Sequence, residues 1–414
     1  MNTNISFRRP NGQSVIKGEV VLPGSKSISN RVLIIKALCK DNFLIKNLSK
    51  ANDTVVLNNI LNHLDSNVNV EDAGTVMRFL TAFLSIQEGE WEVSGTDRMH
   101  KRPIEDLVDA LNELGADIQY LGNYGFPPLK INGKTLGGKK ISINANKSSQ
   151  FVSAVLLIAP YLKGGLTLDL GQEIVSKPYI DMTINLMQYF GINIIVQDNS
   201  IQVEEGQYMA KDIFIESDWS AASYFYSIAA FADEAEIILG GLDKESIQGD
   251  AVIQEIMTQL GVATKFLDNH KILLIKSKLK VINEHIDFLD CPDLAQTLVV
   301  IYAGLGISGK FSGLKTLKIK ETDRVGALKN ELKKIGVDVN ILNDDTIVIN
   351  ESSIETNEHI LFQTYKDHRM AMAFAPLAIL LSNISLDDKS VVKKSFPDYF
   401  TALKHLGFEI TTQN

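Results

Sequence analysis

The chain has 414 residues, a length that predicts two domains rather than one hydrophobic core. Apolar residues make up 45% and charged residues 22%, the usual balance of a soluble globular protein. The formal net charge of -9 argues against nucleic acid as the main partner, because a phosphate backbone needs a basic face. Small phosphorylated ligands remain possible, since they need only a local cluster of Lys and Arg.

The residues also argue against several other classes of protein. Cys39 and Cys291 are the only cysteines, and neither a CxxC nor an HExxH motif is present, so we expect no disulfide scaffold and no metal site. Residues 1–14 are polar and lack the apolar core of a signal peptide. The apolar stretches at 151–160 and 371–381 are too short to span a bilayer. We therefore expect a cytoplasmic protein without a membrane partner.

A repeated pattern organises the chain: an amphipathic helix, then glycine, then an alternating strand. Glycine just past a helix can adopt the left-handed conformation that closes it. These glycines, roughly 70 to 76 residues apart, are Gly115, Gly191, Gly261, Gly336 and Gly407. A degenerate copy without glycine begins at Val55. Six such units predict two similar α/β domains of three units each, although helix–Gly–strand is also common in unrelated α/β proteins.

The first segment with chemical potential is LPGSKSISNR at residues 22–31. Pro-Gly ends a strand, and Ser25 or Ser27 can cap a helix that carries Lys26 and Arg31 near its start. Hydroxyls, backbone N–H groups and two cations at a helix start suit an anion. An ordinary capped helix with two solvated cations explains this segment about equally well.

Four further segments follow before the middle of the chain. A Gly-Thr turn at 72–78 enters an apolar helix, and 95–103 packs three cations into five residues. Two serines and a glutamine at 148–151 open another apolar helix, and Ser-Lys-Pro-Tyr occupies 176–179. Taken alone, each is explained by local capping, a turn or a solvated charged face. The two hydroxyls and the amide exceed what one cap requires.

In the last third of the chain, 320–324 and 365–370 each place an Arg at a helix start beside acids that could hold it. Asp293 precedes an apolar helix, and Lys394 follows a second lysine. The sequence contains no Walker A motif, Rossmann fingerprint, nucleophile elbow or acidic triplet for Mg²⁺. These residues predict an anion-binding transferase or lyase that moves protons without a metal or a covalent intermediate.

The ordered motifs LPGSKSISNR, AGTVMRF, RMHKRPI, SSQF, SKPY, IKETDR, KDHRMAM and FPDYF resemble the EPSP synthase family from Leu22 to Phe400. The resemblance implies a two-domain inside-out α/β barrel built from six repeated helix–strand folding units, with helices buried and sheets outside. One domain would combine residues 1–23 and 217–414, on the phosphoenolpyruvate side. The other would span 24–216, on the shikimate 3-phosphate side, with the active site in the interdomain cleft.

The family reaction implied is attack of the 5-hydroxyl of shikimate 3-phosphate on C2 of phosphoenolpyruvate, protonation of its methylene carbon, and loss of phosphate. The residues that would bind shikimate 3-phosphate are Lys26, Ser27, Arg31, Ser148, Ser149, Gln150, Ser176, Tyr179, Asp293 and Lys320. Those that would surround phosphoenolpyruvate are Lys26, Gly74, Arg98, Gln150, Arg324, Arg369 and Lys394. Asp293 would accept the hydroxyl proton, while Glu321 and Lys394 would handle the methylene proton, with Lys26 also in the catalytic set.

Four positions depart from the usual family pattern. Asp72 and Lys366 stand where Asn is common, Phe79 where Pro is common, and Thr316 where some members have an Asn that contacts shikimate 3-phosphate. None removes a charge that the chemistry needs. The retained Gly74 implies sensitivity to glyphosate. No exposed apolar stripe demands a partner, so we expect a monomer, and we expect no cofactor.

Three alternatives compete with this reading. The related enolpyruvyl transferase acting on UDP-N-acetylglucosamine carries a reactive Cys in a mobile loop, whereas Cys39 is expected within a helix and Cys291 beside Asp293. RNA 3′-phosphate cyclase shares the folding unit, and the acidic net charge argues against it. A binding protein for a phosphorylated metabolite that has lost catalysis would not need the acid and base residues.

Overall fold

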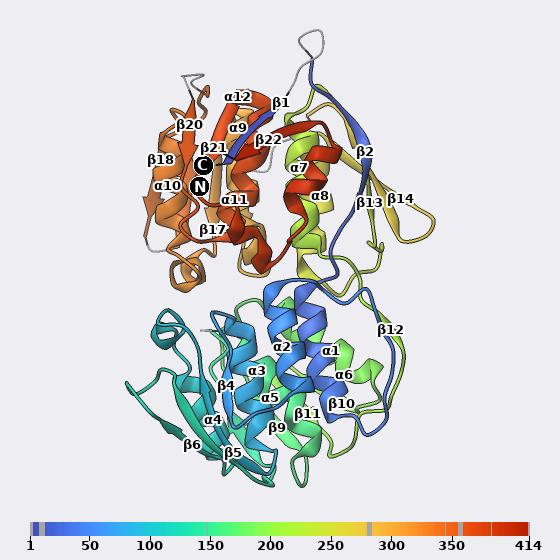
Figure 1. The fold of residues 1–414 in the computed structure, drawn as a ribbon, viewed down its shortest axis with the longest axis vertical. Coiled ribbons are helices and arrows are strands. Elements are labelled where there is room, and N and C mark those ends of the chain that lie inside the picture. The colour runs from blue at the N-terminus through green and yellow to red at the C-terminus, as the bar shows by residue number, and fades with distance from the viewer. Residues whose placement is uncertain are drawn as a thin grey trace. The chain divides into compact units, whose positions relative to one another are not determined.

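The computed structural model describes residues 3–7, 13–146, 148–279, 284–343, 345–354, 359–381 and 383–412. The chain divides into two compact units (Figure 1). Unit 1 combines residues 1–24 with 216–414, and unit 2 is the inserted stretch 25–215. The two crossings of the chain lie close together, because Gly24 pairs with Ser217 through an antiparallel bridge.

Unit 1 contains three four-stranded sheets among its described residues. The first has the order β14 (Val262–Leu267), β15 (Lys271–Lys276), β13 (Glu234–Gly240) and β2 (Val15–Val21). The second has the order β16 (His285–Asp287), β17 (Gly309–Ser312), β19 (Thr346–Ile349) and β18 (Val339–Leu342). The third has the order β20 (Ile360–Phe362), β21 (Asn383–Leu386), β1 (Thr3–Phe7) and β22 (Phe408–Thr412).

The core of unit 1 is made of helices that are buried on every side. All residues of α7 (Trp219–Phe231) and α11 (His368–Phe374) are buried, as are those of α9 (Ala295–Leu305) up to Ala303. The more peripheral helices are α8 (Ile253–Gln259), α10 (Arg324–Lys333), α12 (Ala378–Leu381) and α13 (Tyr399–His405). α7 and α9 carry no charged side chain that could face water, so their sequences favour helices inside and sheets outside.

Unit 2 follows the same plan with one sheet reduced. Two sheets have the orders β4 (Asn67–Asn69), β5 (Gly89–Ser94), β7 (Leu129–Gly133), β6 (Asp117–Tyr120) and β10 (Ile194–Gln197), β11 (Ser200–Val203), β9 (Leu166–Asp169), β8 (Lys140–Ser142). The remaining sheet is the parallel pair β3 (Ile45–Lys46) and β12 (Ile213–Phe214). The helices are α1 (Lys26–Leu38), α2 (Asn52–Asn62), α3 (Gly74–Ser85), α4 (Glu105–Glu113), α5 (Ser149–Ile158) and α6 (Lys177–Tyr189).

The predicted helix–Gly–strand repeat is confirmed at all five glycines. Each follows a helix with a positive φ, between 79° and 94°, and leads into an antiparallel edge strand. Four of these strands belong to hairpins, whereas β22 pairs with β1 from the other end of the chain. The degenerate copy at Val55 differs, because α2 leads instead to β4, which pairs in parallel with β5 at the edge of the next sheet. The sixth unit therefore keeps its helices but has a sheet of only two strands.

Every four-stranded sheet shares one pairing plan: a parallel pair at one edge and an antiparallel pair at the other, which is a hairpin in all of them except the sheet that ends in β1 and β22. In the described part of the chain the sheets stay open and separate, so each unit is a set of sheets around buried helices, not one closed barrel. Among the described helices, none is both long and apolar enough to cross a membrane.

Candidate active site

Arg324, the first residue of α10, lies at the centre of a buried ion-pair cluster in unit 1. Its Nε donates to Asp367 Oδ2 at 2.8 Å, and its Nη2 donates to Glu321 Oε2 at 2.9 Å. A longer contact of 3.5 Å joins its Nη1 to Asp293 Oδ1. Burial opposes the charge, but the surrounding carboxylates, Asp367 first among them, raise the pKa of Arg324 above its ordinary value.

Arg369, the second residue of α11, holds Asp293 from the other side. Its Nη2 lies 2.7 Å from Asp293 Oδ2, and its Nη1 donates to the Asp293 carbonyl and to the Tyr224 hydroxyl, each at 3.3 Å. Asp367 caps α11, because its Oδ1 accepts from the backbone N–H of Arg369 at 2.8 Å. The Asp293 side chain is 20% exposed, so a ligand can reach it.

Glu321 and Lys394 complete the cluster. Lys394 ends a 3₁₀ turn (Ser390–Lys394), and its Nζ lies 3.5 Å from Glu321 Oε1. Glu321 is therefore shared between Lys394 and Arg324, with both Glu321 and Lys394 side chains 10% exposed. The cluster balances three carboxylates against three cations: Asp293, Glu321 and Asp367 against Arg324, Arg369 and Lys394.

The segments in unit 2 that carry predicted ligands begin helices whose first turns contact one another. Ser25 caps α1, where its Oγ accepts from Ile28 N, and the Lys26 ammonium lies 3.7 Å from Asp53 Oδ2 in the first turn of α2. Gln150 Nε2, in the first turn of α5, donates to Thr75 Oγ1 of α3 at 3.2 Å. Helix N-termini gathered in this way favour anions.

Arg31 of α1 forms hydrogen bonds with residues of α5 and α6. It donates from Nε to Thr183 Oγ1 at 2.7 Å, and from Nη2 to Ser153 Oγ and the Tyr179 carbonyl, both at 3.0 Å. Burial lowers the pKa of Arg31 to about 10. Phe79 lies against this guanidinium, with its ring centre 5.4 Å from Cζ, which accounts for an aromatic residue at that position. A ligand held by Arg31 would have to compete with the bonds inside the protein.

The turn at Gly74 is packed against arginines, one of which the sequence reasoning missed. A Cβ at Gly74 would lie 2.2 Å from Arg102 Nη1 and 2.6 Å from Arg78 Nη1. Arg78 donates to the Gly74 carbonyl at 2.7 Å, so it braces the turn. Of the cations in RMHKRPI we predicted Arg98 as a ligand, whereas the structure places Arg102 on the glycine. No signal in the sequence distinguishes these two arginines.

The remaining predicted ligands have distinct local settings. Ser148 caps α5 and accepts from Gln150 N at 3.3 Å, next to the buried Ser149. Ser176 precedes α6 with a φ of 57°, an uncommon value for a residue other than glycine. Thr316 lies in a 3₁₀ turn (Lys315–Ile319), and its buried hydroxyl has no partner among the described residues. The half-buried residues Ser27, Tyr179 and Lys320 flank these segments.

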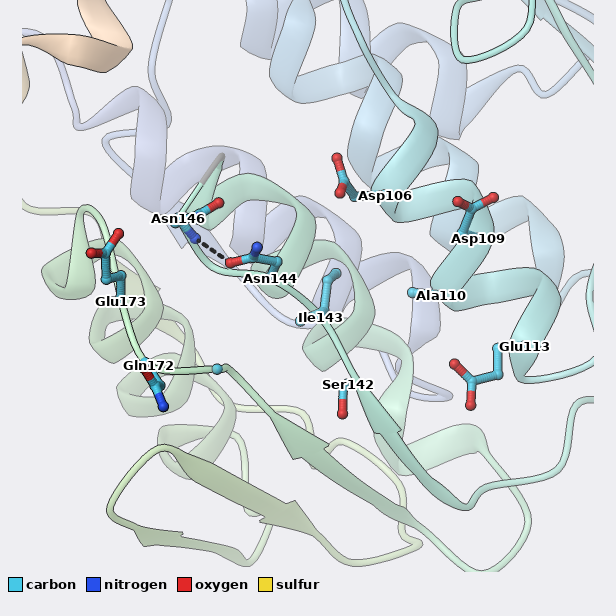
Figure 2. Close-up of a pocket in the computed structure, with 11 residues that line it drawn as sticks. Asp106, Asp109, Ala110, Glu113, Ser142, Ile143, Asn144, Asn146, Gln172 and Glu173 are labelled. Atoms are coloured by element: carbon cyan, nitrogen blue, oxygen red, sulfur yellow. Dashed lines mark hydrogen bonds between the residues drawn. The ribbon is translucent and has the colours of Figure 1, made fainter.

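A cavity of about 650 Å³ in unit 2 contains none of the predicted ligands (Figure 2). Its acidic lining comes from Asp106, Asp109 and Glu113 of α4, with Glu173 opposite (Figure 2). The Asn144 side chain accepts from the backbone N–H of Asn146 at 3.3 Å at its edge. Among the residues that the structure describes, no Lys or Arg lines this cavity, so its charge is opposite to what a phosphorylated substrate needs.

Cationic helix starts beside paired carboxylates, on this fold, define a transferase class that acts on anionic substrates. The sequence model of the EPSP synthase family, described as 3-phosphoshikimate 1-carboxyvinyltransferase, matches residues 10–73 and 65–403. A 3-phosphoshikimate 1-carboxyvinyltransferase of Bacteroides fragilis is 48% identical over 398 residues, 96% of this chain and 97% of its own. One from Shewanella sp. is 37% identical over 416 residues, 93% of this chain and 96% of its own.

The solved structure of EPSP synthase from Acinetobacter baumannii shares the fold, with a TM-score of 0.80 over the whole of both chains at 22% identity. The chain belongs to the EPSP synthase family. It is an enzyme of the shikimate pathway that transfers the enolpyruvyl group of phosphoenolpyruvate to the 5-hydroxyl of shikimate 3-phosphate and releases phosphate.

Proposed function

We propose that the charged cluster of unit 1 binds phosphoenolpyruvate and performs the proton transfers of this reaction. The observation that carries the proposal is the shared carboxylate of Asp293, held 2.7 Å from Arg369 and 3.5 Å from Arg324. Planar guanidinium groups suit the carboxylate and phosphate of phosphoenolpyruvate. Lys394 would supply a third cation.

An anionic substrate would change the balance of this cluster. As phosphoenolpyruvate draws Arg324 and Arg369 toward itself, Asp293 loses part of its stabilising charge and holds a proton more readily. Asp293 would then accept the proton of the attacking 5-hydroxyl. Glu321, shared between Arg324 and Lys394, would exchange a proton with the methylene carbon. The fixed cations would stabilise the charge on the departing phosphate.

The shikimate side is assigned to unit 2, with Lys26 reaching both substrates. The support is the set of helix starts at Lys26, Ser148 and Ser176, of which the first two are capped by serine hydroxyls. These helix starts offer hydroxyl and backbone donors to a phosphorylated ring. Ser27, Ser149, Gln150 and Tyr179 belong to the same helix starts. The roles of Arg31, Lys320 and Thr316 in binding the ring, and of Arg98 toward phosphoenolpyruvate, remain predictions from the resemblance.

We add Arg102 to the ligands proposed for phosphoenolpyruvate, because its guanidinium lies where a side chain at Gly74 would be. Gly74→Ala should displace Arg102 and raise the KM for phosphoenolpyruvate, with little change in that for shikimate 3-phosphate. Gly137→Ala is the matched control, since a Cβ there meets nothing within 4 Å. Equal KM values for wild type and Gly74→Ala would contradict this role of Arg102.

The first test is phosphate release from the purified protein with phosphoenolpyruvate and either shikimate 3-phosphate or UDP-N-acetylglucosamine. Release with shikimate 3-phosphate alone is expected, together with the product mass of an enolpyruvyl ether. Phosphate release with the sugar nucleotide alone would overturn the assignment of shikimate 3-phosphate as the acceptor substrate. Burial raises the pKa of Cys291 well above its ordinary value, so this thiol is a poor nucleophile for that rival chemistry. Cys39 is the C-cap of α1, just past the helix in which we expected it.

Glu321→Gln separates catalysis from binding. The variant keeps the size of the side chain but cannot exchange a proton, so turnover should fall by about 10²–10⁴-fold while shikimate 3-phosphate binds as before. A protein that only binds its ligands would show no turnover to lose. Glyphosate inhibition, a monomeric state and a cytoplasmic location also belong to this proposal. Full activity in millimolar-range glyphosate would count against the first of these.

A further inference from the structure

Asp250 is a buried acid close to the unit 1 cluster to which the proposed mechanism gives no role. It lies in a 3₁₀ turn (Gly249–Val252) and its side chain is almost fully enclosed. Its Oδ2 accepts a short hydrogen bond from the hydroxyl of Ser220, in the first turn of α7. Its Oδ1 has no hydrogen-bond partner among the described residues. Burying a carboxyl this deeply with a single hydrogen bond costs stability, so its presence calls for an explanation.

The Ser220 hydroxyl connects Asp250 to the proposed catalytic groups. Arg369 Nη2 donates to Ser220 Oγ at 3.5 Å, and the same nitrogen lies 2.7 Å from Asp293 Oδ2. A continuous line of polar contacts therefore runs from Asp250 through Ser220 and Arg369 to Asp293. All four groups lie in unit 1.

The direction of these bonds gives Asp250 its effect. A serine hydroxyl has one proton and two lone pairs. Because Ser220 donates its proton to Asp250, its lone pairs face Arg369 and accept from it. Without the Asp250 acceptor the hydroxyl would be free to rotate toward other acceptors, and the guanidinium would lose one of its fixed contacts.

We propose that Asp250 is a positioning residue for enolpyruvyl transfer, which acts through Ser220 to fix the Arg369 guanidinium between Asp293 and the incoming phosphoenolpyruvate. Asp250 touches neither substrate in this scheme. Its influence should appear in the steps that depend on Arg369 and Asp293. The inference rests on the proposed roles of those two residues.

The charges around Asp250 are consistent with this role. Burial, and next the charge of Asp293, raise the pKa of Asp250 to about 7, whereas Arg369 and the Ser220 hydrogen bond act in the opposite direction. Asp218, the cap of α7, adds a further negative charge, and the Cys291 thiol lies within the same field. The electrostatic state of this network therefore changes within the neutral range of pH.

Single and double variants test the proposal by steady-state phosphate release. Ser220→Ala breaks the line at its middle, and Asp250→Ala removes the acceptor. Each should lower kcat and raise the KM for phosphoenolpyruvate, so that kcat/KM falls on the order of tenfold. The binding of shikimate 3-phosphate should stay unchanged. The double variant should be no worse than either single one, because both remove the same connection.

The second part of the test changes the charge of residue 250 without changing the shape of its side chain. Asp250→Asn keeps an acceptor for Ser220, so kcat should recover relative to Asp250→Ala, while the pH profile of kcat should lose the contribution of a group that titrates near pH 7. Glu255→Gln, at an exposed position of α8, removes the same charge from the same unit and should leave rate and profile unchanged. Circular dichroism and thermal unfolding confirm that each variant is folded before its rate is compared.

The outcomes distinguish this inference from the proposed function. Asp293→Asn should be inactive in any case, and its full activity would overturn the site itself. With Asp293→Asn inactive, unchanged kcat, KM and pH profile in folded Ser220→Ala and Asp250→Asn would overturn the role of Asp250. Additive losses in the Ser220→Ala/Asp250→Ala double variant would also overturn it, since independent sites add.

Discussion

The two aspartates that cap α10 and α11 differ in their further contacts. Asp323 caps α10 and accepts from the Gly326 N–H at 3.1 Å from an exposed position. Asp367 caps α11 and is also the main partner of Arg324, whose side chain is 2% exposed. We expect Asp323→Ala to lose about 1 kcal/mol of unfolding free energy, as a lost cap.

Asp367→Ala should instead lose about 3–5 kcal/mol, because it leaves the Arg324 charge buried without that partner. Urea unfolding followed by circular dichroism measures both values on the same scale. If Asp367→Ala loses no more unfolding free energy than Asp323→Ala, the charge of Arg324 is sufficiently neutralised by its other carboxylate partners.

Asp250 makes stability depend on pH in a direction opposite to most acids. Burial raises its pKa from 3.8 to about 7 in the folded protein. Between these values the folded state binds more protons than the unfolded state, so its contribution to stability is greatest below pH 3.8 and is lost as pH rises through about 7. The difference corresponds to roughly 4 kcal/mol at most.

Asp250→Asn removes this titration. The stability of the variant relative to wild type should therefore increase steadily from pH 5.5 toward pH 8. The Tm of both proteins, measured across this range, tests the sign. A difference in Tm that stays constant with pH would mean that Asp250 does not titrate there in the folded protein.

At the scale of elements, the turn before α11 contains a lysine, Lys366, in a backbone conformation that lysine rarely adopts. Tyr365 and Lys366 both have positive φ, 54° and 57°, and Asp367 N donates to the Thr364 carbonyl at 2.9 Å. Two consecutive positive φ values are typical of a type I′ turn, which prefers Asn and Gly. The Tyr365 hydroxyl donates to Glu331 at 2.7 Å and holds its residue in place, whereas Lys366 is exposed.

Lys366→Asn should therefore stabilise the protein by about 0.5–1 kcal/mol, since Asn tolerates the left-handed region better than Lys. The matched control is Lys333→Asn, an exposed lysine in the last turn of α10, which should lose about 0.5 kcal/mol because Asn is a poorer helix former. Chemical denaturation gives both changes. A loss for Lys366→Asn similar to that of the control would mean that the lysine makes a compensating contact.

The sequence predicted the elements better than their pairing. Gly115 and its counterparts revealed five helix ends, because only a positive φ closes those helices and glycine adopts it without strain. The Arg residues at the starts of α10 and α11 were also predicted from local sequence, because each stands at a helix start beside acidic residues. The position of β4 was not, since a three-residue strand leaves no periodicity to distinguish a hairpin from a parallel edge.

Within the site, the sequence predicted only those functional residues that belong to recognisable motifs. Ser220 and Asp250 lie 30 positions apart in sequence, in an apolar helix and an unremarkable turn, and only the packing of α7 against that turn joins them. Arg102 was missed for a similar reason, because its contact with Gly74 depends on how the turn before α3 packs. Contacts between distant segments are a property of the fold rather than of any window of sequence.

At the scale of the whole molecule, the two units differ in how they depend on the chain. Unit 2 is continuous, and all its strand pairs lie within residues 25–215. Unit 1 depends on the N-terminal segment, because β1 lies between β21 and β22 and pairs with both. β2 also forms the edge of the first sheet beside β13. A fragment of residues 216–414 would lack an inner strand and expose unpaired backbone on either side of the gap.

The isolated segment 25–215 should therefore unfold in one cooperative thermal transition, whereas the segment 216–414 should show none. Differential scanning calorimetry of both fragments tests this expectation, and a cooperative transition in 216–414 would show that β1 is dispensable. If unit 2 carries the shikimate side, the ligand should also raise the Tm of 25–215, by an amount equivalent to about 2.7 kcal/mol at a concentration of 100 Kd. The same fragment with Ser176→Ala should gain less. Neither fragment should release phosphate, because the proposed proton-transfer groups Asp293 and Glu321 lie on one unit and the proposed ring ligands on the other.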